Sequence, residues 1–143
     1  MMRYISNEYT PTSFSGKDSK DKAYLDMVLS TAQDIKNAAS NQFYSTGDRE
    51  AITKMAFERL PALEKFLGDN QYIIGDYVTF LDFFIWELIE LFTFASNGEI
   101  LVRLPKLAEY HKRVAALPKF SEYLKSDRFM VRPFNNKIAK LNN

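Results

Sequence analysis

The sequence lacks cysteine altogether and contains a single histidine, His111. Without cysteine the chain can form no disulfide, no thiol nucleophile, no redox-active pair and no zinc site built on thiolates. One histidine is too few for a metal centre built on several imidazoles. Because the absence of thiols suits a reducing compartment, we expect a cytoplasmic protein with no metal ion and no bound cofactor.

The chain also lacks an excess of charge and a membrane-spanning segment. Its 19 basic and 18 acidic residues give a formal net charge of +1, so no general field attracts nucleic acid or an anionic membrane. No apolar stretch of signal-peptide length precedes Glu8. The most apolar segment, residues 72–95, includes four carboxylates, which are costly inside a bilayer: Asp76, Asp82, Glu87 and Glu90. We expect no nucleic-acid partner and no membrane insertion.

Glycine and proline are scarce, with five of each, and no β-branched run alternates with polar residues over the length of a strand. Apolar and aromatic residues are abundant, since 46% of the 143 residues are hydrophobic and 12 Phe and 8 Tyr are among them. A chain of this length and composition can bury a core as one domain. We therefore predict an all-α fold, a bundle of five or six helices.

Apolar residues at spacings of three and four predict where the helices lie. A first helix is predicted over residues 21–43. A second follows the turn at residues 45–48 and ends at Gly68. Pro61 falls inside this second helix, and because proline removes a backbone hydrogen bond and clashes with the preceding turn, we expect a kink or a break there.

A central helix is predicted over residues 80–95, where the sequence is apolar on nearly all sides. Pro105 and Pro118 each occupy a position typical of the first turn of a further helix. We expect three parts along the chain: residues 1–20 as an N-terminal segment and linker, residues 21–126 as the helical bundle, and residues 127–143 as a basic tail that packs on the bundle.

The C-terminal region is the most basic part of the chain. From residue 125 to residue 143 it has five basic side chains and one acidic side chain, a net charge of +4. This charge suits an anionic partner, but it is also typical of a tail that is simply solvated.

Thr79 and Asp82 have the spacing of a capping box, with Asp in the usual place of Glu. In this interpretation the Asp82 carboxylate reaches back to the Thr79 amide, and the Thr79 hydroxyl caps the Asp82 amide. The pair is predicted to begin the central helix and to matter for stability rather than for chemistry. Either residue replaced by alanine is expected to lower the free energy of unfolding by about 0.5–2 kcal/mol.

Four other side chains each have a structural and a functional interpretation. His111 is better explained by packing than by metal binding, because it has no second imidazole to join it. Trp86 and the Phe residues around it are better explained as core residues than as parts of a ligand site. Glu87 and Glu90, three residues apart, resemble a carboxylate pair, although a strip facing solvent or ion pairs to a neighbouring helix explain them as well.

Several segments together resemble the C-terminal domain of glutathione transferases. The first is the Gly-x-x-x-Thr-x-x-Asp run formed by Gly75, Thr79 and Asp82 at the start of the central helix. Residues 104–107, 120–126 and 128–134 look like the last helices and tail of the mu class, and residues 4–6 are similar to the last helix of the preceding thioredoxin-like domain. The resemblance covers almost the whole chain and implies the helical fold of that domain.

The resemblance also implies roles for two residues of the first helix. Asp34 falls where the mu class has an aspartate that reaches the amino group of glutathione across the dimer. Tyr44 falls where the class has a tyrosine facing the hydrophobic substrate, able to donate a hydrogen bond to the electrophile. From spacing alone, Asp34 is typical of a solvated charge and Tyr44 of a packing residue.

Two functions follow from the resemblance, because the thioredoxin-like domain that holds most glutathione-binding groups is absent from this sequence. In the first, the chain is a non-catalytic binding or structural module with a protein partner, a second copy of itself or a hydrophobic small molecule. In the second, it is the hydrophobic-substrate half of a transferase, with glutathione as co-substrate when a thioredoxin-like domain is supplied. Asn7, where the class tends to have an interface arginine, and the long segment at residues 10–20 depart from the class pattern.

Overall fold

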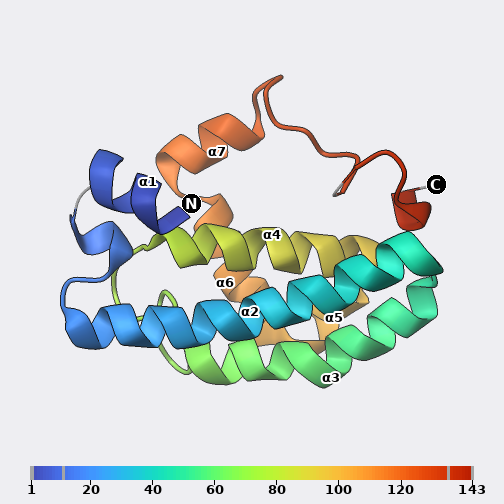
Figure 1. The fold of residues 1–143 in the computed structure, drawn as a ribbon, viewed down its shortest axis with the longest axis horizontal. Helices are drawn as coiled ribbons and strands as arrows, with labels where there is room; N and C mark the ends of the chain where they lie inside the picture. Colours follow the sequence, from blue (N-terminus) through green and yellow to red (C-terminus); the bar gives the residue numbers. More distant parts are fainter. Residues whose placement is uncertain (1, 11, 135, 143) are drawn as a thin grey trace.

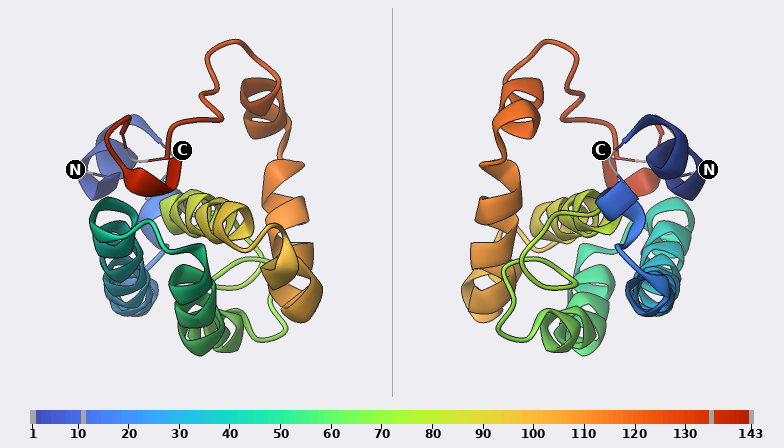
Figure 2. Two further views of the ribbon diagram at one scale, coloured as in Figure 1. Left: turned by 90° about the vertical axis from the view of Figure 1, so that its right-hand side faces the viewer. Right: turned by 90° about the vertical axis from the view of Figure 1, so that its left-hand side faces the viewer.

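One apolar helix, α4 (Phe80–Ala95), lies at the centre of the fold (Figure 1). The computed structural model describes residues 2–10, 12–134 and 136–142. Helices α2 (Ser19–Ser45) and α3 (Arg49–Leu67) pack on α4 from one side, and α6 (Pro105–Ala115) packs on it from another (Figure 2). Apart from an isolated bridge, these described residues form helices and turns only. The prediction of an all-α fold is confirmed.

Shorter helices complete the bundle and raise their number above the prediction. The described residues form seven α-helices and two 3-10 turns, against five or six predicted helices. Helices α1 (Met2–Tyr9) and α5 (Glu99–Arg103) are the ones that the periodicity did not predict, because eight and five residues are too few to establish a repeat. The other short elements are η1 (Thr12–Ser15), α7 (Pro118–Leu124) and η2 (Lys140–Asn142).

Helix α2 begins two residues earlier than predicted. Asp18 is its N-cap, and its carboxylate accepts a hydrogen bond of 2.8 Å from the Asp21 amide. An Asp that accepts from the third amide of a helix is a strong start signal, which makes Ser19 helical. Residues 10–20, predicted as a linker, therefore include the turn η1 and the first residues of α2.

Helix α3 is continuous across Pro61, so the predicted break into two helices is wrong, and the predicted kink stays a prediction. Pro61 lies on the exposed side of the helix, where water can hydrate the backbone carbonyl that loses its partner. The residues on the inner side are fully buried: Ile52, Ala56, Leu60 and Leu63. Packing of that inner face holds the helix together over its whole length.

The C-terminal segment leaves the bundle after α7, arches over α4 and returns to the end of α2 (Figures 1 and 2). Its last part is packed, because Ala139 and Leu141 are buried and η2 lies on α2. Met130, Val131 and Ile138 remain exposed. The tail is therefore solvated only in part. Nowhere in the described chain is a helix both long and apolar enough to cross a membrane.

Candidate functional site

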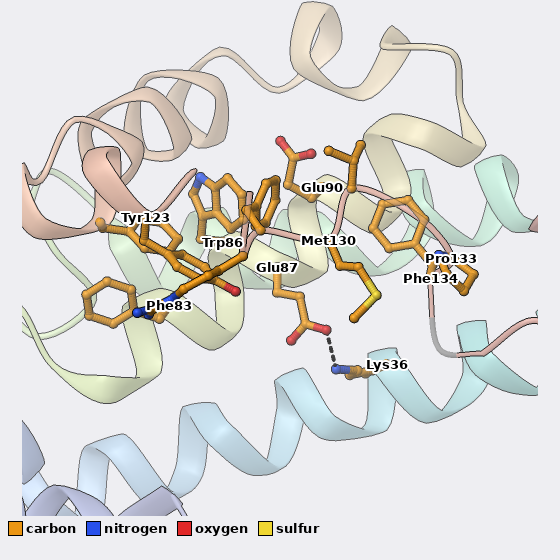
Figure 3. A pocket seen from close by; sticks show the side chains of 13 residues that line it. Lys36, Phe83, Trp86, Glu87, Glu90, Tyr123, Met130, Pro133 and Phe134 are labelled. Carbon is orange, nitrogen blue, oxygen red and sulfur yellow. Dashed lines mark hydrogen bonds and ion pairs between the residues drawn. The ribbon is translucent and has the colours of Figure 1, made fainter. Parts of the chain in front are cut away.

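A cavity of about 560 Å³ lies between α4, α7 and the arch of the C-terminal segment (Figure 3). Helix α4 supplies the floor through four side chains in successive turns, and α2 contributes Lys36 at one edge. The remaining walls come from α7 and from the arch. Most of the lining side chains are aromatic or aliphatic: Phe83, Trp86, Phe120, Tyr123, Phe129, Met130, Val131, Pro133 and Phe134.

Trp86 is the centre of the aromatic lining. Its ring stacks on His111 with a centroid separation of 5.2 Å and an interplanar angle of 4°. Phe120 meets the indole edge-on at 4.9 Å, and Phe129 of the arch meets it at 6.3 Å. The indole N–H is buried and has no hydrogen-bond partner among the described residues. Trp86 is thus both a core residue, as predicted, and part of the cavity wall.

The charged groups of the cavity lie in opposite pairs. Lys36 Nζ on α2 is 3.0 Å from Glu87 Oε1 on α4, as the dashed line in Figure 3 marks. Glu90 Oε1 is 2.7 Å from Nε2 of His111, although the ring N–H does not have the alignment of a regular hydrogen bond. Each carboxylate therefore contacts a side chain of a neighbouring helix, which is one of the two interpretations of this Glu pair.

Two arginines flank the wall that the arch builds. Arg128 lies over the ring of Tyr123 at 5.8 Å. Arg132 lies over Phe94 at 3.9 Å and over Phe134 at 4.4 Å. Burial lowers the pKa of Arg132, the charge of Glu90 acts in the opposite direction, and the nearby Arg49 lowers this pKa further. Arginine remains charged under all relevant conditions, so these contacts are cation–π contacts.

The capping box is formed by Thr79 and Asp82 at the start of α4, directly before the cavity-lining Phe83 in the sequence. Oδ2 of the fully buried Asp82 accepts from the Thr79 amide at 2.7 Å and from the Thr79 hydroxyl at 2.9 Å. Oδ1 accepts from the Ile73 amide at 3.0 Å and from the Tyr110 hydroxyl at 2.8 Å. The carboxylate therefore joins the loop before α4, the helix start and α6.

Burial decides the ionisation of this cluster. Desolvation raises the pKa of Asp82, and the hydrogen bonds from Ile73, Thr79 and Tyr110 lower it by less. Burial also raises the pKa of the Tyr110 phenol far above its usual range, and the neighbouring Asp82 raises it further. The phenol therefore stays protonated and acts as a donor.

Asp34 and Tyr44 are both exposed on α2 and do not line the cavity. Asp34 is exposed in a shallow hollow between α2 and α3, beside Glu58 and Arg59. Tyr44 is 37% exposed near the end of α2. Ten residues along a helix separate two side chains by about 80° in direction, so Asp34 and Tyr44 face different directions. Their predicted contacts with glutathione and an electrophile stay predictions.

The sequence did not indicate the outer wall of the cavity. Phe129 and Phe134 lie in the C-terminal segment, for which the composition indicated only a basic charge. The aromatic character of these two residues was the one feature of the sequence that pointed to a cavity wall. As for cofactors, no three His, Asp or Glu side chains of the described chain converge closely enough to hold a metal ion. The cavity instead offers aromatic rings and two compensated carboxylates.

Comparisons with known proteins agree with the fold. A family model described as the glutathione S-transferase C-terminal domain matches residues 33–127. The class-mu 26 kDa isozyme 7 of Fasciola hepatica, a glutathione S-transferase, is 30% identical over 140 residues, and human glutathione S-transferase Mu 4 is 29% identical over 140 residues. Each alignment covers 95% of this chain and 62% of the relative.

A solved structure described as rat hPGDS complexed with a quinoline has a similar fold. Its TM-score is 0.71 with 22% sequence identity, and the match covers 89% of this chain and 66% of that chain. At this identity the likeness supports the fold alone. The chain spans about 62% of the length of the two transferases it resembles.

Proposed function

This chain belongs to the glutathione S-transferase family through that family's C-terminal domain, and on this premise we propose that its 143 residues by themselves form a non-catalytic binding module. Its relatives are mu-class transferases along almost the whole chain, as the motifs predicted. The binding face in this proposal is the cavity between α4, α7 and the arch. The observation that carries the proposal is the chemistry of its lining.

The lining favours an apolar occupant. Six aromatic rings face the cavity, and burying such surface is the main source of affinity for apolar molecules. The ion pair of Lys36 with Glu87 and the contact of Glu90 with His111 leave little free charge to attract a polar ligand. The occupant is an apolar protein surface, a second copy of the chain or a hydrophobic small molecule.

The same groups argue against thiol activation by this chain alone. A thiol becomes a nucleophile when a neighbouring base or cation favours the thiolate. Lys36 is already engaged with Glu87, so its ammonium is not free to favour a thiolate in the cavity. Arg128, the other cation of the lining, is exposed beside Tyr123.

Binding in the cavity can be tested through Trp86, the only tryptophan of the chain. We expect energy transfer from Trp86 to N-phenyl-1-naphthylamine, an uncharged apolar dye, when the purified chain is titrated with it. Phe83→Ala is expected to weaken the dye's affinity, because Phe83 lines the cavity. Phe57→Ala, which removes a half-buried ring from α3 below Arg103, is the matched control. Equal affinities for both variants would place the dye elsewhere.

The alternative function, the hydrophobic-substrate half of a glutathione transferase, has its own support. The relatives named above are transferases, and their additional length leaves room for a further domain. Asp34 and Tyr44 are both exposed and so accessible to a partner domain or a second subunit. Conjugation of glutathione that appears only after fusion to a thioredoxin-like domain would favour this alternative.

A further inference from the structure

The outer wall of the cavity is a stretch of chain without helix, residues 125–134, which follows α7 (Figure 1). It contributes six of the lining residues: Arg128, Phe129, Met130, Val131, Pro133 and Phe134. Along this stretch the side chains are loosely packed, since Met130 is 76% exposed and Val131 is 60% exposed. Figure 3 shows Met130 extending into the cavity toward Lys36. Contacts of this wall with α4 include the rings of Phe129 and Phe134 and the guanidinium of Arg132, which lies over Phe94 at 3.9 Å.

The far end of this segment is held much more firmly. Ala139 is fully buried and Leu141 is 2% exposed, and both belong to the hydrophobic core. The Lys140 ammonium donates a hydrogen bond to the Ser45 carbonyl at the end of α2. We call residues 139–141 the anchor and residues 125–134 the strap.

The anchor fits against Gly47 at the distance of direct contact. Gly47 has a φ of +68°, and a Cβ on it would lie 2.9 Å from Lys140 Cβ and 3.1 Å from the Leu141 amide nitrogen. Real Cβ atoms essentially never come this close to a neighbour, so any larger residue would displace the anchor. Glycine in this turn lets the end of the chain sit directly on α2.

We propose that the strap opens and closes the cavity, and that its release is controlled by the anchor on Gly47. When the anchor is seated, Phe129 and Phe134 are held against α4 at ring separations of 6.3 and 5.4 Å from Trp86 and Phe94. When the anchor leaves, the wall loses this support and keeps its side-chain contacts with α4 and α7, among them Arg132 over Phe94 at 3.9 Å and Phe129 against Tyr123 at 5.6 Å. The nature of the molecule that enters the cavity rests on the proposed function. The opening of the strap does not.

Hydrogen–deuterium exchange tests the opening without any ligand. Leu141→Ala removes the larger anchor side chain, and we expect amides in residues 125–134 to exchange about tenfold faster or more, because the closed form alone gains from burying Leu141. Amides of α4 are expected to keep their protection. Ile138→Ala is the matched control, since Ile138 is 79% exposed in the same segment. Equal exchange in both variants and the unchanged protein would overturn the proposal.

The rate at which a probe enters the cavity tests whether the anchor governs access. Gly47→Ala adds a Cβ that would lie 2.9 Å from Lys140 Cβ, so it displaces the anchor. We expect the uncharged dye N-phenyl-1-naphthylamine to enter the cavity of this variant about tenfold faster than that of the unchanged chain. Gly98→Ala is the matched control, because Gly98 also has a positive φ of +88° but no atom lies within 4 Å of a Cβ there. Equal entry rates in Gly47→Ala and in the unchanged chain would refute control by the anchor.

The two proposals fail in different ways. If the unchanged protein takes up no dye, the proposed function as a binding module is wrong. The hydrogen–deuterium exchange of residues 125–134 then tests the opening of the strap by itself. If Leu141→Ala unfolds the whole chain, Gly47→Ala decides on the strap. A strap that exchanges at the same rate in Gly47→Ala and in the unchanged chain is not released at the anchor.

Discussion

Replacing Asp82 by alanine tests the idea that one buried carboxylate holds the start of the central helix in place. The substitution leaves four buried donors without their acceptor: the amides of Ile73 and Thr79 and the hydroxyls of Thr79 and Tyr110. A buried donor left unpaired costs about 1–3 kcal/mol, and the Ile73 and Thr79 amides cannot turn to another acceptor as the two hydroxyls can. We therefore expect Asp82→Ala to lower the free energy of unfolding by about 2–6 kcal/mol, more than the capping motif alone predicts.

Two smaller perturbations of the same cluster set the scale. Thr79→Ala removes one hydroxyl and leaves the Asp82 carboxylate three donors, so a loss of about 0.5–2 kcal/mol is expected. Tyr110→Phe likewise removes one hydroxyl, and about 1 kcal/mol is expected. Urea unfolding followed by circular dichroism gives all three values, with Glu122→Ala on the exposed face of α7 as a control that leaves the midpoint unchanged.

The order of these three values is the decisive result. If Asp82→Ala costs no more than Thr79→Ala, the carboxylate is not shared by the loop, the helix start and α6, and the reasoning is refuted. A changed denaturant slope instead of a changed midpoint would mean that the folded or unfolded ensemble has altered in compactness.

The pH dependence of the same cluster has a definite sign. Because burial raises the pKa of Asp82, the folded chain keeps its proton at a pH where the unfolded chain has released it. The stabilising contribution is complete below the unfolded pKa of about 3.9 and is lost as the pH rises through the folded value. We expect the stability advantage over Asp82→Asn to shrink across that interval. An advantage that grows with pH would contradict burial as the dominant cause.

The isolated chain is expected to conjugate no glutathione to an aromatic electrophile, because the Lys36 ammonium of its cavity is engaged with Glu87 and is not free to favour a thiolate; turnover by the purified chain would show otherwise. After fusion to a thioredoxin-like domain, Asp34→Asn is expected to raise the KM for glutathione. Tyr44→Phe is expected to change kcat by a factor that depends on the electrophile, whereas equal kinetics would remove Tyr44 from the site. In native extract the protein is expected to sediment as a dimer or within an assembly, since its cavity face is apolar and open; sedimentation at 16.6 kDa would count against this.

Local sequence patterns predicted the helices where periodicity and start signals coincide. The stripe of α2, the prolines that begin α6 and α7, and the Thr79 and Asp82 spacing depend on neighbours in sequence, so they can be recognised without a fold. Pro61 shows the limit of local reasoning. Its local preference is to break a helix, but the packing of Leu60 and Leu63 on the other side keeps α3 continuous.

The candidate site was less accessible to sequence reasoning. Asp34 and Tyr44 came from resemblance to a family, and the structure places both on the surface, away from the cavity. The cavity unites residues that are far apart in the chain, such as Lys36 and Phe134. No spacing rule connects such positions, because their distance depends on how the helices cross and where the arch returns.

By itself, the sequence determined that this protein is all-α, that α4 is its central helix and that a capped helix start precedes it. These properties follow from hydrogen bonds and apolar contacts between residues a few positions apart. Only the tertiary structure decided that Asp82 accepts a hydrogen bond from Tyr110 as well as from Thr79, that Trp86 faces a cavity, and that the C-terminal residues pack against Gly47. Each of these contacts joins distant segments, and it exists because burying the faces of several helices at once leaves few ways to pack them.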